Sequence, residues 1–136
     1  MAERSDVDLM VDLLARERRL VSAYEAALRR DAIDASLGEM LLAHERAHVA
    51  ALERTLAGRG NPTATVPSPE LTAAVRDRRS FAQYAIRLED ETIAAYADGV
   101  PRIRDPKLRQ PLGSIMVCGG AHLVALRDSI GISLVD

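Results

Sequence analysis

Glu45 and His48 are the two side chains whose types and spacing in this sequence are best suited to chemistry. Apolar residues recur around them with the spacing of a helix that buries one face, at Leu41, Leu42, Val49, Leu52 and Leu56. Glu45 and His48 fall on that face, where burying a carboxylate or an imidazole is costly unless a partner compensates for the lost hydration. A Glu-x-x-His pair that projects inward from a bundle helix can ligate a metal ion.

A second acid-containing motif occurs twice. Glu17 is followed seven residues later by Tyr24, and Glu89 is followed at the same spacing by Tyr96, with an offset of 72 residues between the copies (89 − 17). Both glutamates fall on the apolar stripe of their segment, although exposed helix edges and pairing with arginine are the more common places for glutamate. Their position in both copies favours a role as ligands.

The histidine motif is also repeated. The segment around His48 aligns with the segment around His122, with an offset of 74 residues (122 − 48). Each half of the chain therefore predicts one helical hairpin, and two hairpins can cover each other's apolar faces. The candidate metal ligands collected from the two halves are Glu17, Glu45, His48, Glu89 and His122.

The hydrophobic periodicity predicts an all-α fold, an antiparallel four-helix bundle of two helical hairpins joined by a long crossover. The expected helices span about residues 6–30, 37–57, 69–99 and 106–130. Pro69, after Ser68 as a cap, is a suitable first residue for the third helix. Residues 59–69 can reach roughly 36–40 Å when extended, and a 22-residue helix is about 33 Å long. The crossover can therefore span the bundle, and the inward polar residues then meet near its middle.

Composition narrows the class of protein further. The 136 residues, with a net charge of −2, no Trp and one Phe, fit one domain over 1–136 with an aliphatic core. Nothing favours nucleic acid or a membrane as a partner, because charges of both signs are mixed and no apolar run could span a bilayer. The single cysteine, Cys118, and the polar N-terminus predict a cytoplasmic protein. The apolar tail 132–135 suggests self-association, which we expect to give a homodimer.

Taken together, these motifs resemble the ferritin-like superfamily, which includes ferritins, bacterioferritins and rubrerythrins. The resemblance covers most of residues 6–131 and implies that Glu17 and His48 hold one metal ion. Glu89 and His122 would hold a second ion, with Glu45 bridging the two. The chain departs from the family on the fourth helix, where Gly119 stands three residues before His122 in place of a second bridging glutamate.

The resemblance implies a metal-dependent function. Iron is the expected metal, as two ions or as one if the site is degenerate, and manganese or zinc also suits these ligands. The implied activity is that of an oxidoreductase of the ferroxidase or peroxidase type, with O2 or peroxide as partner. Tyr24 and Tyr96 would steady the ligands or supply an electron; as side chains alone, they are also ordinary core aromatics.

Two alternatives to the di-metal site remain open at this point. The bundle could have lost its chemistry and act as a structural or interaction protein, which Gly119 favours. His44, His48 and His122 could form a mononuclear three-histidine site. Cys118 is interpreted as a small core residue rather than a ligand.

Overall fold

A computed structural model of the chain describes residues 4–61 and 76–132, and within these ranges the fold is entirely helical. The helices are α1 (Asp6–Arg29), α2 (Ala35–Gly58), α3 (Arg78–Gly99) and α4 (Pro106–Ser129), with a short 3-10 helix, η2 (Val100–Arg102), after α3. None of these helices is both long and apolar enough to cross a membrane. The all-α four-helix prediction is confirmed, and the tail residues 133–136 lie outside the described ranges.

The start of α3 differs from the sequence prediction. The expected helix from Pro69 is not continuous with α3, because Asp77 is extended (φ −152°, ψ 180°) and caps a helix that begins at Arg78. The Asp77 carboxylate accepts a hydrogen bond from Ser80 N at 2.7 Å, and Ser80 Oγ accepts one from Asp77 N at 3.0 Å. This reciprocal cap satisfies backbone donors that a helix start leaves unpaired. Residues 62–75, including Ser68 and Pro69, lie outside the described part of the chain.

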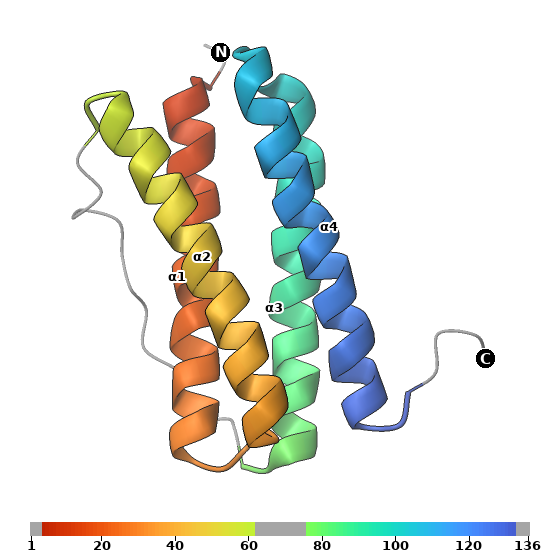
Figure 1. Ribbon diagram of the computed structural model, residues 1–136. Helices are drawn as coiled ribbons and strands as arrows, with labels where there is room; N and C mark the ends of the chain where they lie inside the picture. The colour runs from red at the N-terminus through yellow and green to blue at the C-terminus, as the bar shows by residue number, and fades with distance from the viewer. Residues whose placement is uncertain (1–3, 62–75, 133–136) are drawn as a thin grey trace.

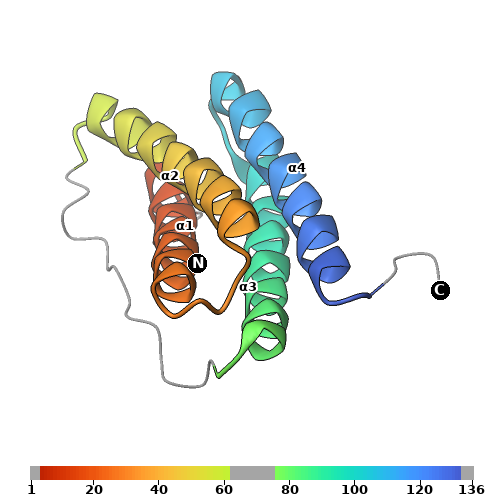
Figure 2. The ribbon, with the colours of Figure 1, turned by 60° about the horizontal axis from the view of Figure 1, so that its bottom comes forward.

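The four helices form two antiparallel hairpins. α1 packs mainly on α2 and α3 mainly on α4. α2 ends at the opposite end of the bundle from the start of α3, so these two helices run parallel, as the crossover prediction requires (Figure 1). The hairpins meet largely through α1 and α3, whereas α2 and α4 make few contacts and stand apart (Figures 1 and 2).

Contacts at both ends of the bundle fix how the hairpins are aligned. At one end, the Asp6 carboxylate accepts hydrogen bonds from the backbone N–H groups of Arg104 and Asp105, at 2.8 and 3.0 Å. At the other end, Arg78 of α3 pairs with Asp31 in the α1–α2 turn at 3.0 Å. These contacts tie the ends of one hairpin to the other, so that residues at mid-height of the helices come to the same level.

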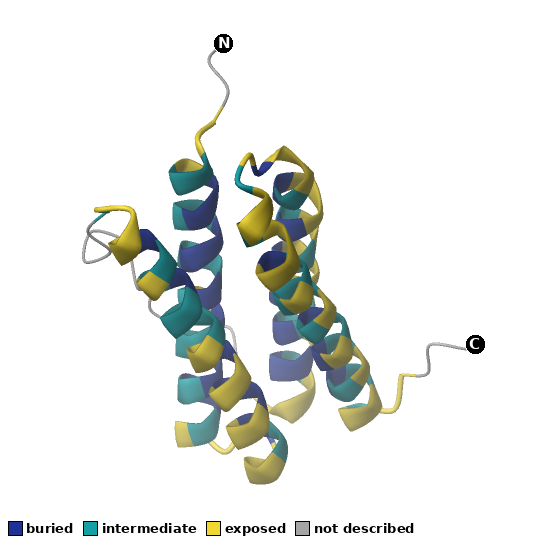
Figure 3. Cartoon of the chain, turned by 45° about the horizontal axis from the view of Figure 1, so that its top comes forward, coloured by how far each residue is buried: buried dark blue, intermediate teal, exposed yellow. Residues whose placement is uncertain are grey.

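The apolar core consists of two clusters, and buried residues line the inward faces of the helices (Figure 3). The cluster nearer the α1–α2 turn includes Leu20, Leu41, Phe81 and Leu126, and the cluster nearer the other end includes Leu14, Leu52, Leu56 and Leu112. Along α1 and α2, the buried acids lie between residues of these two clusters. The core is therefore interrupted at mid-height by a buried polar layer.

Candidate metal centre

The five residues predicted as ligands converge in this polar layer, one or two from each helix. Glu17, Glu45, Glu89 and His122 are each only 1% exposed, and the His48 side chain is 13% exposed. Three carboxylates removed from water at one level of the core need compensating protons, cations or hydrogen bonds. The centre is thus a place where the fold concentrates negative charge at an energetic cost.

Glu45 occupies the middle of this centre. Its Oε2 lies 3.2 Å from Nδ1 of His48, and its Oε1 lies 2.8 Å from Nδ1 of His122. Ligand atoms of Glu17, Glu45 and His48 all lie within 4.8 Å of one another, and so do those of Glu45, Glu89 and His122. The two groups share Glu45, so one carboxylate faces both halves of the centre.

The two tyrosines reach across the bundle. Tyr24 donates its phenolic O–H to Glu89 Oε1, and Tyr96 donates to Glu17 Oε1, both at 2.7 Å. Each tyrosine of one repeat therefore orients the glutamate of the other. Burial, and then the charge of the carboxylate it contacts, raises the pKa of each tyrosine well above its ordinary value. Both phenols consequently stay protonated as hydrogen-bond donors.

Without a cation, protons must compensate for the buried acids. Burial, and then hydrogen bonding with Glu17, raises the pKa of Glu45 to about 8. Burial acts to lower the pKa values of His48 and His122, but hydrogen bonds to two carboxylates each outweigh it and raise both to about 10. At neutral pH the metal-free centre therefore holds two imidazolium groups and a largely protonated Glu45.

One oxygen atom tests directly whether these residues fit a metal ion. Glu17 Oε2 is buried and has no hydrogen-bond partner within the described residues; the His48 ring nitrogen is 3.7 Å away. Burial acts to raise the pKa of Glu17, yet the neighbouring Glu45 carboxyl and His48 imidazole leave it lowered, which implies a proton carried by Glu45. Either that proton or a cation satisfies the unpaired oxygen. Carboxylate oxygens with imidazole nitrogens fit iron, manganese or zinc.

Gly119 marks the gap in this arrangement. It occupies the position that corresponds to Glu45 in the second repeat (119 − 45 = 74). A Cβ at Gly119 would lie 3.7 Å from Glu89 Oε2 and 3.0 Å from Ile93 Cγ1, so a side chain here would enter the centre. The cavity that Gly119 helps to line holds only about 10 Å³, roughly the space of one water molecule.

The three-histidine alternative is not what the geometry favours. His48 directs its Nδ1 to Glu45 in the carboxylate layer. His44 lies on the other side of the His122 ring, with its Nδ1 3.0 Å from His122 Nε2. The three imidazoles do not share a common group of ligand atoms among the described residues.

Sequence reasoning missed the position of Cys118. The cysteine is half-buried rather than a core residue, and its Sγ lies 3.4 Å from His122 Nε2. Its place four residues before His122, one helical turn away, is the signal that could have revealed it.

Comparison with known proteins agrees with the four-helix fold. A family model described as "Ferritin-like domain" matches residues 5–131, which is nearly the whole chain. Neither a curated protein nor a solved structure matches the chain at a significant level. Since the match extends over all four helices and the polar layer between them, this chain belongs to the ferritin-like domain family.

Proposed function

We propose that this protein binds two divalent metal ions, iron or manganese, in a carboxylate-bridged centre at mid-bundle. Glu17 and His48 would hold one ion, Glu89 and His122 the other, and Glu45 would bridge them. The observation that carries the proposal is the position of Glu45, whose two oxygens face the Nδ1 atoms of both histidines at 3.2 and 2.8 Å.

The unpaired oxygen of Glu17 supports the same proposal. A buried acceptor without a donor is destabilising by about 1–3 kcal/mol, more if it is charged, and a cation removes that cost. Binding would also displace the protons held by His48, His122 and Glu45, since ligating imidazole nitrogens and carboxylates must be free of protons. The protein thus keeps in place, with protons, a set of ligands whose charge suits divalent ions.

The proposed reaction is oxidation of ferrous iron or reduction of O2 or peroxide. Two ferrous ions supply two electrons, enough to convert O2 to hydrogen peroxide or hydrogen peroxide to water. The residues of the chain leave little free space and fix orientation: the cavity beside Gly119 has about the volume of one water molecule, and Tyr24 and Tyr96 hold Glu89 and Glu17 in place. Each phenol also lies where a carboxylate can take its proton, so we keep both as candidate electron donors.

Gly119 favours a second candidate function, that of a bundle without catalytic activity. With three carboxylates instead of four, each ion would have one glutamate, one histidine and the shared Glu45, and the three acids balance only part of the charge of a second ion. If that ion binds too weakly to be retained, the protein would act through a single ion or through a partner, such as a second copy in the expected homodimer.

Metal analysis and an oxidation assay separate these functions. Metal-free protein is reconstituted anaerobically with Fe2+ or Mn2+, the bound metal is counted after desalting, and Fe2+ oxidation is followed after addition of O2 or hydrogen peroxide. The proposed function predicts about two ions per chain and oxidation faster than in buffer. The matched variants are Glu45→Ala, which should abolish both, and Glu39→Ala, which removes an exposed glutamate of the same helix and should change neither. Absence of bound metal in the wild-type protein would contradict the proposal.

A further inference from the structure

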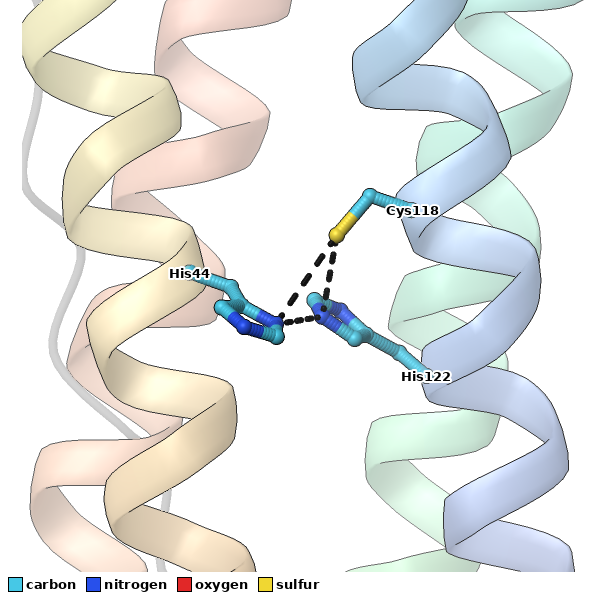
Figure 4. A group of neighbouring side chains, drawn as sticks. All are labelled: His44, Cys118 and His122. Carbon is cyan, nitrogen blue, oxygen red and sulfur yellow. Dashed lines mark hydrogen bonds between the residues drawn. The ribbon is translucent and has the colours of Figure 1, made fainter.

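A second group of ligand-type side chains lies just outside the carboxylate layer, between α2 and α4. His44 Nδ1 is 3.0 Å from His122 Nε2, and Cys118 Sγ is 3.4 Å from His122 Nε2 and 3.8 Å from His44 Nδ1 (Figure 4). Figure 4 shows the three side chains pointing toward one another across the gap between the two helices. Two nitrogens and one sulfur thus form a compact triangle.

The size of this triangle can be compared with what a metal ion requires. With Zn–N bonds of about 2.0–2.1 Å, Zn–S bonds of about 2.3 Å and tetrahedral angles, two nitrogens lie about 3.3 Å apart and a nitrogen and a sulfur about 3.6 Å apart. The observed distances of 3.0, 3.4 and 3.8 Å scatter around these values. Small movements of the side chains would therefore place all three atoms around one ion.

The triangle is accessible to solvent on one side. His122 is buried, Cys118 is half-buried and His44 is exposed, so the cluster faces outward on its His44 side. α2 and α4 make few contacts with each other, so the three side chains lie between two helices that are not closely packed. A solvent molecule or an external ligand could complete the coordination of an ion held there.

We propose that His44, Cys118 and His122 form a second metal site, which takes one thiolate-binding cation, Zn2+ or Cu+, distinct in chemistry from the carboxylate centre. A thiolate with two imidazoles selects such borderline or soft ions, whereas the carboxylates select iron or manganese. The site extends the repeat: Cys118 corresponds to His44 at the offset of 74 residues that also relates His122 to His48 (118 − 44).

His122 belongs to both sites, and this sharing has a consequence that rests on the proposed function. Its Nδ1 faces Glu45 and Glu89, while its Nε2 faces His44 and Cys118. A neutral imidazole has one lone pair, so it ligates through one nitrogen and carries the proton on the other. An ion at Nε2 therefore removes His122 as a ligand of the inner centre, and the outer site competes with the second inner ion.

Cobalt titration tests the outer site directly, because this chain has one cysteine and any cobalt–thiolate signal must come from Cys118. Reduced, metal-free protein is titrated with Co2+, and the absorption is read in the near-ultraviolet charge-transfer region and the visible region. We expect a thiolate band that saturates at one equivalent, with visible bands of tetrahedral cobalt, and displacement of both by Zn2+. A parallel titration with Cu+ under a competing chelator shows whether the softer ion is preferred.

Three variants distinguish this site from a simple His122–His44 hydrogen bond. Cys118→Ser should abolish the thiolate band, and His44→Ala should weaken cobalt binding by about tenfold or more. Glu17→Ala, which alters only the inner centre and does not contact His122, should keep the band. As a second measurement, Zn2+ should slow alkylation of Cys118 in the wild type but not in His44→Ala.

The proposal is overturned if excess Co2+ gives no thiolate band in the wild type, or if the band is undiminished in His44→Ala. A thiolate band in protein that binds no iron or manganese would support the outer site while contradicting the proposed function. Binding of two ions at the carboxylate centre without any thiolate band would support the proposed function and contradict the outer site.

Discussion

The two helical hairpins contribute unequal halves to one centre. The first supplies Glu17, Glu45 and His48, whereas the second supplies Glu89 and His122, with Gly119 where the second bridging acid would be. Both halves nonetheless bring their histidine to the same carboxylate, at 3.2 and 2.8 Å. A repeat can thus lose one ligand and keep its geometry, because the surviving acid of the other half faces both sides.

On the outer side of the repeat, both hairpins keep a ligand-type residue, but of different chemistry. At the positions equivalent to each other in α2 and α4, the first hairpin has His44 and the second has Cys118. The loss of an oxygen ligand at Gly119 is thus accompanied, one residue earlier, by a sulfur atom beside the same histidine. The second hairpin therefore has a thiol, a ligand type that suits soft cations, where the first has an imidazole.

The largest expected effect comes from the shared acid. Glu45→Ala removes a ligand from both ions and should abolish binding of two Mn2+ ions, with a loss of affinity of about a hundredfold or more. Glu17→Ala removes a ligand of the first half only and should leave about one ion bound. Isothermal titration of the metal-free variants measures both. Equal losses in the two variants would show that Glu45 is not shared.

The number of protons released on metal binding tests whether both histidines lose a proton when the ions bind. Their pKa values of about 10, and that of Glu45 of about 8, lie above 7, so metal binding at neutral pH should release about three protons per two ions. Because protons compete with the ions, affinity should rise with pH between 6 and 8. The dependence of the binding enthalpy on buffer ionisation enthalpy gives the number released. A pH-independent affinity would contradict proton displacement.

Restoring the missing acid should make the two halves more alike. Gly119→Glu should strengthen binding of the second ion by about tenfold or more, since it adds a fourth carboxylate. It should also destabilise the metal-free protein, because another acid is buried and Ile93 Cγ1, 3.0 Å from the new Cβ, must shift. Gly119→Gln carries nearly the same volume without the charge. If both variants bind the second ion equally, the missing charge does not limit its affinity.

The smallest expected difference is between the losses of stability caused by replacing each of the two tyrosines. Removing a hydrogen bond to a charged group costs about 1.5–3 kcal/mol, so Tyr24→Phe and Tyr96→Phe should both lower the free energy of unfolding of the metal-free protein. Tyr96→Phe should cost more, because the imidazole nearest to Glu17, that of His48, is 3.7 Å away, whereas His122 lies 3.1 Å from Glu89. Urea denaturation measures both values. A larger loss in Tyr24→Phe would reverse the comparison.

Much of this arrangement follows from the sequence, because helical periodicity and an internal repeat both fix which side chains face inward. Glu17 and Glu89 lie on the buried stripe of helices that pair across the bundle, and the structure brings them to one level. The cross-pairing of the tyrosines could also have been derived: two antiparallel helices with the same Glu–Tyr spacing set each phenol opposite the other glutamate.

Other features depend on information that periodicity does not carry. The cap at Asp77 was hidden because Leu71 and Val75 continue the apolar spacing of α3 toward the N-terminus. Whether Cys118 and His122 meet His44 depends on how far α2 and α4 stand apart, which is a property of the packing of whole helices. Local sequence patterns specify which face of a helix is buried, but not the distance between two helices.

Anomalous diffraction from crystals loaded with Mn2+ or Fe2+ tests the central claim most directly. We predict two peaks at mid-bundle on either side of the Glu45 carboxylate, one beside Glu17 and His48 and one beside Glu89 and His122. An anomalous difference map with no peak between the four helices, from crystals soaked in the same metal, would contradict the carboxylate-bridged centre.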